Sequence, residues 1–249
     1  AGLADNSTTT DVVSYFNFRP FKLRSGSPLE NFNIGTSLVL GKNRRPTDLL
    51  PLRTSIQSSE NDEEAEAASA TFLEFESDVV GYGERVLGAI HAAWDHGPFS
   101  VETEWNALQF ELLNEATDEG LDIQANGFHV TVASFLTGET LSGRETVRPL
   151  RPFDPRRGYR QLGAIEPFAR YSYLKIGDEL FDSGFADESE WTDKVSMTDI
   201  GVNWYLNQYA KFVFDWQHAG YGSPVLVNED TGEVSNSNDL YWCRCQFYF

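Results

Sequence analysis

The chain has 249 residues, enough for one large domain or two small ones, and it carries 38 acidic against 19 basic side chains. The resulting net charge of -19 excludes a typical nucleic-acid-binding protein, which needs a basic surface. No stretch approaches about 18 consecutive apolar residues, which excludes a transmembrane helix but not a membrane-spanning β-barrel. Aromatic residues make up 14% of the chain while the hydrophobic fraction is 41%. This combination favours a sheet in which apolar and polar side chains alternate.

Segments with such period-two alternation recur along the whole chain, separated by polar or Gly/Pro-rich connections. In chain order they cover residues 12–21, 32–40, 71–76, 85–95, 99–107, 122–136, 164–174, 199–206, 211–217 and 238–249. Strands of soluble proteins average about five or six residues, whereas a tilted membrane-spanning strand needs about 9 to 11. Several of the predicted strands reach the membrane-spanning length. The acidic residues 60–68 are a candidate helical turn, although a solvated loop is the favoured interpretation.

Alternation alone fits both a soluble β-sandwich and a membrane barrel, because one face is apolar in either case. Strand length, aromatic residues at the ends of apolar strands, and short turns alternating with long polar connections favour the barrel. The aromatic residues are Trp94, Trp105, Tyr171, Tyr173, Trp204 and Trp216. We therefore predict an all-β fold, an antiparallel transmembrane β-barrel of the bacterial outer membrane, with residues 1–249 in a single domain.

The parity of the strands orients the connections if the last strand ends on the periplasmic side, as in barrels of this kind. Connections 220–237 and 176–197 are then extracellular. The short turns at 96–98 and 207–208 are both periplasmic, which is where short turns occur in outer-membrane barrels.

Two connections are unusually long for the side that this parity gives them. Residues 137–163 are predicted to be periplasmic, and residues 41–68 are either periplasmic as well or contain an additional strand near 47–55. The first ten residues lack the basic and apolar regions of a secretory signal peptide, so an exported protein would be present here in mature or truncated form.

The chain ends in the aromatic stretch YWCRCQFYF, in which Tyr241, Cys243, Cys245, Phe247 and Phe249 share one face of a strand. We expect this face to contact lipid. The two cysteines are splayed at their i, i+2 spacing, which disfavours a disulfide between them. A C-x-C metal or redox site is an alternative to two small apolar residues. Phe247 and Phe249 resemble the terminal signal that barrel-assembly machinery recognises.

The opposite faces of the strands are polar and are predicted to line a water-filled pore, whose selectivity depends on its diameter and its charges. The predicted lumen-facing residues are Arg85, His91, Asp95, Glu102, Glu104, His129, Glu166, Arg170, Asp199, Lys211, Asp215 and Arg244. Six of the ten charged residues are acidic, which does not indicate an anion-selective surface. Ion pairs within the barrel wall are the alternative role for these charges.

Arginines and acidic residues each gather in one predicted connection. The basic cluster consists of Arg148, Arg151, Arg156, Arg157 and Arg160. It would attract anions to one mouth of the channel, or pair with acidic neighbours such as Asp154. The acidic residues of 178–190 could bind Ca²⁺, but their spacing differs from that of an EF-hand loop. An acidic surface loop is favoured there, and also for residues 62–66.

The sequence offers little that an enzyme could use. Its four histidines show no HxxxH or HxH spacing, and neither a G-x-S-x-G motif nor a glycine-rich phosphate loop is present. Glu102 and Glu104 share a face as a glycosidase pair would, but wall charges explain them more simply. We predict no catalytic site, no bound metal and no cofactor.

Several segments resemble the phosphate-selective porin O/P family. GFHVTVASFLTGET (127–140), RPLRPFDPRRG (148–158), FARYSYLKIGDELF (168–181) and DIGVNWYLNQYAKFVFDWQH (199–218) are similar to its C-terminal portion. GSPLENFNIG (26–35), LPLRT (50–54) and HGPFSVETEW (96–105) are similar to its middle section in order and spacing. The LTGE…RPFDP and GxNWYLN elements together are specific, and the resemblance covers nearly the whole chain.

The resemblance implies an outer-membrane barrel of about 16 antiparallel strands, usually a trimer, that passes small anions by diffusion. Because roughly ten or eleven strands are predicted here, the chain is expected to correspond to the C-terminal two-thirds of such a barrel. The arginine ladder and lysine cluster of the family have no matching motif in this sequence.

We therefore predict a porin for small solutes or ions, with phosphate and other anions as candidates. Its expected partners are outer-membrane lipid, the barrel-assembly machinery and further copies in a homotrimer, without nucleic acid. A structural barrel bound to other envelope proteins and a soluble β-sandwich binding module are the alternatives.

Overall fold

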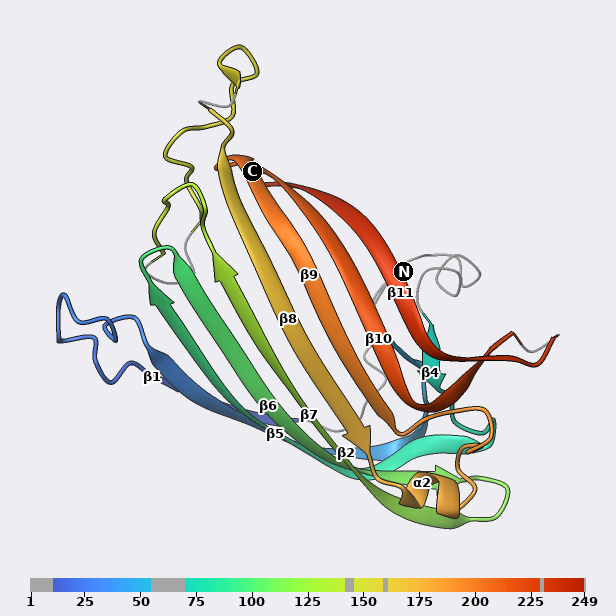
Figure 1. Ribbon diagram of the computed structural model, residues 1–249. Coiled ribbons are helices and arrows are strands. Elements are labelled where there is room, and N and C mark those ends of the chain that lie inside the picture. The colour runs from blue at the N-terminus through green and yellow to red at the C-terminus, as the bar shows by residue number, and fades with distance from the viewer. Residues whose placement is uncertain (1–10, 55–69, 142–145, 159–160, 229–230, 249) are drawn as a thin grey trace.

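The computed structural model describes residues 11–54, 70–141, 146–158, 161–228 and 231–248. Nine strands form one antiparallel sheet in the order β1-β2-β5-β6-β7-β8-β9-β10-β11. Figure 1 shows this sheet as a strongly curved wall, with β1 and β11 at its two edges. The predicted all-β, antiparallel fold of the barrel type is confirmed. Within the described residues the wall is open, because β1 and β11 do not pair.

The strands of the wall are β1 (Val12–Phe18), β2 (Asn33–Asp48), β5 (Val79–His96), β6 (Phe99–Asn114), β7 (Glu119–Ser134), β8 (Ala164–Ile176), β9 (Lys194–Asn207), β10 (Ala210–Asn228) and β11 (Glu233–Phe247). A separate two-stranded sheet pairs β3 (Leu52–Arg53) with β4 (Thr71–Leu73), and α2 (Glu179–Asp182) is a short helix. No helix in the described ranges is long and apolar enough to cross a membrane.

The connections leave the wall alternately at two ends, which we call the C-terminal end and the α2 end. In Figure 1 the C-terminal end is at the top and α2 lies at the bottom. The β5–β6 turn and the β9–β10 turn both lie at the C-terminal end, so the prediction that they share one side is confirmed. Gly97 adopts a positive φ of 59° in the first of these turns, a conformation that glycine tolerates without strain.

Of the two alternatives predicted for connection 41–68, the one that places it on the same side as the end of the last strand is wrong, whereas an additional strand near 47–55 is present as the short β3. β2 continues to Asp48 and pairs directly with β5, so the connection leaves at the α2 end and adds no strand to the wall. The predicted strand 71–76 is short, and its first residues form β4, which pairs with β3 instead of a wall strand. Because this segment is not a wall strand, connection 41–68 leaves the wall at the end opposite to the one predicted. The acidic residues 60–68 lie outside the described residues.

The predicted extracellular loop 220–237 is also mostly strand. β10 reaches Asn228 and β11 begins at Glu233, and the two pair through register shifts after Gly220 and Leu226. Main-chain hydrogen bonding continues although the simple alternation of side chains is lost, because a bulge inserts residues without ending the ladder. The strands are therefore longer than the membrane-spanning part that the sequence pattern revealed.

The two faces of the wall exchange polarity part-way along the strands. On β6 the convex face is apolar from Phe99 to Ala107 and then becomes polar at Gln109 and Glu111. On its concave face the order is reversed, since polar residues up to Asn106 are followed by leucine and phenylalanine. The strands β7, β8 and β9 show the same exchange on the concave face, from polar residues near the C-terminal end to Ile123, Ile176 and Val195 near the α2 end.

The apolar part of the convex face is nine residues long on several strands: Val86 to Trp94 on β5, Phe99 to Ala107 on β6, and Ile165 to Tyr173 on β8. Nine residues at a tilt of about 45° rise roughly 21 Å, close to the apolar band of about 25 Å on outer-membrane barrels. This part of the wall has the dimensions of a membrane-spanning belt, and the strands extend beyond it toward the α2 end.

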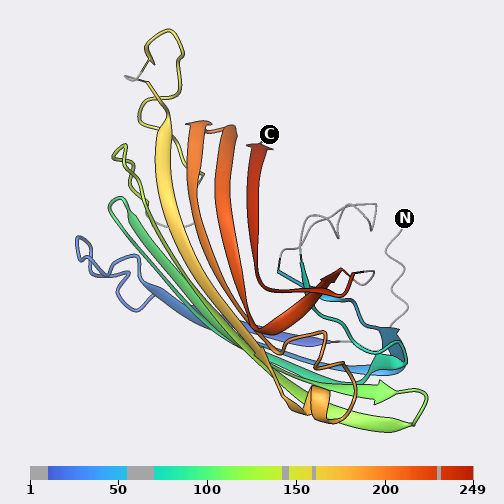
Figure 2. The same ribbon diagram turned by 45° about the vertical axis from the view of Figure 1, so that its right-hand side comes forward.

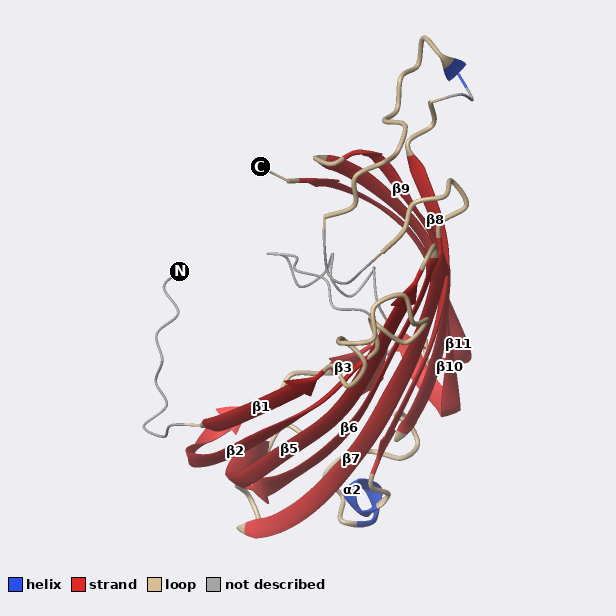
Figure 3. Cartoon of the chain, turned by 90° about the vertical axis from the view of Figure 1, so that its left-hand side faces the viewer, coloured by secondary structure: helices blue, strands red, loops and turns tan. Residues whose placement is uncertain are grey.

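A buried hydrophobic core covers the concave face at the α2 end. The wall contributes Val79, Leu112, Ile123, Ala125, Ile176, Val195 and Val225, and the connections contribute Phe72, Leu73, Leu180, Phe185, Ala186 and Trp191. Figures 2 and 3 show the curvature from the side, with β3 in the hollow of the wall in Figure 3. Burying a leucine or phenylalanine contributes about 1.5–3 kcal/mol. The connections are thus held against the concave face by packing.

Backbone hydrogen bonds link these connections to one another and to β10. The Thr192 amide donates to the carbonyl oxygen of Phe72 at 3.0 Å, and the Glu76 amide donates to that of Phe185 at 3.0 Å. The Leu226 amide on β10 donates to the carbonyl oxygen of Glu190 at 2.8 Å. Two connections that are far apart in sequence therefore form one inward-folded unit, which we call the inner cap: residues 70–78 together with 177–193.

Candidate functional site

The predicted lumen-facing residues lie on the concave face, nearer the C-terminal end than most of the inner cap. Cross-strand pairing aligns His91 with Glu104 and Glu104 with His129. A second row aligns Arg170 with Asp199 and Asp199 with Gln217. The registers place the remaining predicted residues on the same face: Arg85, Asp95, Glu102, Glu166, Lys211, Asp215 and Arg244. Their role in lining a pore stays a prediction.

Two of the acidic residues on this face are withdrawn from solvent. Glu166 is 6% exposed and accepts hydrogen bonds from Asn203 Nδ2 at 2.9 Å and from the Tyr205 hydroxyl at 3.0 Å. Asp199 is 8% exposed and accepts a hydrogen bond from Gln217 Nε2 at 3.0 Å. The count of acidic residues in the sequence therefore overstates the negative charge that this face presents to water.

The exposed charges on the concave face are mainly arginines. Arg85, Arg170 and Arg244 are exposed, and among the predicted acidic residues only Glu102 is exposed to the same degree. Arg85 forms an ion pair with Asp11, and the Arg170 Nε donates to Ser172 Oγ at 3.1 Å. The Arg244 guanidinium lies 4.6 Å from the ring centre of Trp242, a cation–π contact that orients it.

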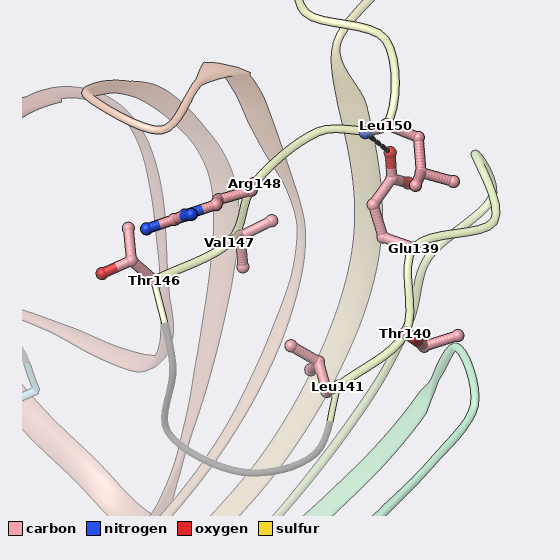
Figure 4. A pocket seen from close by; sticks show the side chains of 7 residues that line it. All are labelled: Glu139, Thr140, Leu141, Thr146, Val147, Arg148 and Leu150. Carbon is pink, nitrogen blue, oxygen red and sulfur yellow. Dashed lines mark hydrogen bonds between the residues drawn. The ribbon is translucent and has the colours of Figure 1, made fainter.

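The long connection between β7 and β8 divides into an inner and an outer part. The inner part lies over the concave face, where the Leu141 amide donates to the Gly97 carbonyl at 3.0 Å and Leu141 lines a cavity of about 300 Å³ with His91 and Glu102. The carboxylate of Glu139 is buried and accepts a hydrogen bond from the Leu150 amide at 2.9 Å (Figure 4). This bond joins the beginning of the inner part to its end.

The basic cluster predicted in this connection is split between the two parts. Arg148 and Leu141 line a cavity of about 560 Å³, which places Arg148 in the inner part over the concave face (Figure 4). Arg151, Arg156 and Arg157 belong to the outer part, which projects past the end of β8 (Figures 1 and 3). Arg160 lies outside the described residues.

Replacing Gly163 by alanine is expected to lower the yield of folded protein, because the new Cβ would collide with the carbonyl oxygen of Tyr205. Gly163 also has a positive φ of 80°, which costs a residue with a side chain about 1–2 kcal/mol. Gly158 is the matched control, since it has a φ of 57° and no atom within 4 Å of an added Cβ. Heat-modifiable gel mobility measures the folded fraction. Equal yields for the two variants would contradict the predicted clash.

The acidic stretch 178–190 belongs to the inner cap. Its apolar residues Leu180, Phe185 and Ala186 are buried, whereas most of its acidic side chains are exposed. Burial raises the pKa of Asp193, and the hydrogen bond from Asp193 lowers the pKa of Asp178, with Lys175 acting in the same direction. Hydrogen bonds from Ser189 lower the pKa of Asp187. Within the described ranges, no group of three His, Cys, Asp or Glu residues is placed to hold a metal ion.

The last strand exposes its cysteines and aromatic residues on the convex face. Cys243 and Cys245 are exposed free thiols, and they pair across the sheet with Phe214 and Phe212. Phe247 is exposed at the end of β11, and Phe249 lies outside the described residues. The two thiols thus continue the apolar belt of the convex face.

The chain is similar to known proteins along most of its length. A sequence profile of the family described as phosphate-selective porin O and P matches residues 16–249. Porin O of Pseudomonas aeruginosa is 26% identical over 257 aligned residues, which cover 96% of this chain and 54% of that protein. The chain spans about half the length of this curated relative. Because the profile matches most of the chain and the resemblance of its motifs is confirmed, the chain belongs to the phosphate-selective porin O and P family.

Proposed function

We propose that the protein is an outer-membrane porin whose concave wall lines a water-filled channel for passive diffusion of small anions, phosphate among them. The observation that carries this proposal is the pairing of an apolar convex belt with a concave face whose exposed charges are mostly arginine. A channel of this kind needs no catalytic group, because charge and diameter alone discriminate between solutes. Family membership and the similarity to a protein named Porin O support the same function.

The proposed path for solutes narrows in two places. At the C-terminal end the inner part of the β7–β8 connection lies over the concave face, and Arg148 lines a cavity within this part. At the α2 end the inner cap fills part of the hollow with tightly packed side chains. Arg170 and Arg244 are exposed on the wall. Arginine offers several hydrogen-bond donors to phosphate oxygens. Exposed arginines along the wall would therefore bind a passing anion briefly and release it.

Several further features belong to the proposal. The chain forms a single barrel domain, with the C-terminal end of the wall on the periplasmic side, and the protein assembles as a homotrimer. Phe247 and Phe249 are the residues that the barrel-assembly machinery would recognise. A closed channel requires partners for the edges of β1 and β11, which are unpaired within the described residues, since unpaired backbone groups are costly in lipid.

Planar lipid bilayers test the function directly. The reconstituted protein is expected to give stepwise conductance, and reversal potentials in asymmetric potassium chloride and potassium phosphate are expected to show preference for the anion. A folded protein that never conducts would refute the porin. Stoichiometric co-purification with other envelope proteins would then support the structural barrel, and a monodisperse protein without detergent would support the soluble sandwich.

A further inference from the structure

The outer part of the β7–β8 connection is attached to the convex face of the wall. The rings of Phe153 and Trp204 meet edge to face with centres 5.4 Å apart, and Trp204 Nε1 donates to the Leu162 carbonyl at 2.5 Å. The Phe153 amide also donates to the Leu206 carbonyl at 2.8 Å. Trp204 pairs across the sheet with Ile165 and Phe212, so it belongs to the apolar convex belt at its C-terminal border.

This segment, residues 151–158, is ordered by its own hydrogen bonds, and we call it the arginine loop. The Arg156 amide donates to Asp154 Oδ1 at 3.0 Å, and the Arg157 amide donates to the Asp154 carbonyl at 3.0 Å. The Gly163 amide closes the base by donating to the Arg151 carbonyl at 3.1 Å. These bonds fix the backbone of a short loop that carries three arginines next to the border of the belt.

The guanidinium groups of the arginine loop are available to a ligand. Arg151, Arg156 and Arg157 are exposed. Arg157 pairs with Asp154 at 3.6 Å, and within the described residues Arg151 and Arg156 form no ion pair. The loop is basic although the chain as a whole has a net charge of -19. Its surroundings are apolar, because Phe153 is partly exposed and the partly exposed Leu162 lies beside Trp204.

We propose that the arginine loop binds the headgroup phosphate of an anionic phospholipid in the leaflet at the C-terminal end of the wall. The inference rests on the proposed function, which places the convex belt in lipid. Tryptophan and phenylalanine at the border of the belt occupy the level of the headgroups, and arginines next to that level attract anionic lipid. Apolar contacts from Phe153 and Leu162 favour a lipid over free phosphate, which has no acyl chain to cover them.

Lipid binding is measured by native mass spectrometry of the folded protein in detergent. The probes are phosphatidylglycerol, phosphatidylcholine with the same acyl chains, and inorganic phosphate as a competitor. The test variant is Arg151→Gln/Arg156→Gln/Arg157→Gln. The control is Lys42→Gln/Arg44→Gln/Arg45→Gln, which removes the same charge from exposed positions toward the α2 end of β2. Phe153→Ala keeps the charges but removes the ring that anchors the loop to Trp204.

The parent and the control are expected to retain phosphatidylglycerol in preference to phosphatidylcholine. The triple arginine variant is expected to bind it about tenfold more weakly or worse, since each arginine near an anionic surface contributes measurably. Phe153→Ala is expected to fall between the two. Equal binding by the triple variant, equal retention of both lipids, or full displacement by equimolar inorganic phosphate would each overturn the proposal.

A separate readout covers the remaining explanation, a contact between copies of the chain. If light scattering showed that the triple variant changes the oligomeric state without changing lipid retention, the loop would be a subunit contact and the lipid site would be refuted. Conductance is recorded independently of lipid binding. A protein that binds phosphatidylglycerol through the loop but never conducts would refute the porin and retain this site, and the reverse result would retain the porin alone.

Discussion

Replacing Phe185 by alanine is expected to raise the single-channel conductance at least twofold, because this ring fixes the inner cap in the hollow of the wall. Phe185 is 2% exposed and belongs to the core shared by the wall, β4 and the connection after β8. Truncating a buried phenylalanine to alanine costs about 3–5 kcal/mol. The Phe185 carbonyl also accepts the hydrogen bond from the Glu76 amide that joins the two connections of the cap, so a loss of this size is expected to loosen the cap while the paired strands of the wall remain folded.

The matched control for this experiment is Leu50→Ala, which alters a side chain that is 80% exposed near the same end of the wall. Exposed substitutions of this kind usually change stability by about 0.5 kcal/mol or less. Conductance in planar bilayers is recorded together with cleavage by a protease added on the α2 side. If the Phe185→Ala cap were cleaved readily while conductance remained at the parent value, the cap would not narrow the path.

Neutralising the exposed arginines of the concave face is expected to change the ion preference of the channel. In the variant Arg85→Gln/Arg170→Gln/Arg244→Gln, three exposed positive charges are lost while Glu102 remains. A charge a few ångströms from a passing ion contributes roughly 1 kcal/mol or less in a water-filled space, so three together can change the permeability ratio by about tenfold. The reversal potential is expected to move from anion preference toward cation preference.

The buried acidic residues provide the comparison for this prediction. Glu166→Gln/Asp199→Asn removes two charges from the same face, but both carboxylates are hydrogen-bonded and almost inaccessible. Their replacement is expected to leave the reversal potential nearly unchanged. A shift as large as that of the arginine variant, in the opposite direction, would show that buried wall charges act on the ion as strongly as exposed ones.

The acidic residues illustrate a general limit of charge counting along a sequence. Alternation placed Glu166 and Asp199 on the correct face together with Arg170 and Arg244. It could not show that neighbouring strands bring Asn203, Tyr205 and Gln217 against the carboxylates. These partners are in contact only because the pairing register aligns them, and register is a property of the assembled sheet.

The inner cap shows the same limit on a larger scale. The signal for it is present in β6, where Leu108, Phe110 and Leu112 occupy the positions that carry Glu102 and Glu104 earlier in the strand. That reversal indicates that something apolar covers the concave face. It does not say which segment does so, and Phe72 and Phe185 come from connections separated by more than one hundred residues.

The sequence by itself determined the all-β class, the convex belt, the shared end of the two short turns and the family. Each of these depends on the local period of two or on contiguous motifs, which a strand expresses wherever it is placed. Only the tertiary structure decided the side of connection 41–68, the inward position of the cap and the division of the arginine cluster between the two faces. These depend on contacts between distant segments, whose burial and hydrogen bonding stabilise one arrangement among several that the local pattern permits.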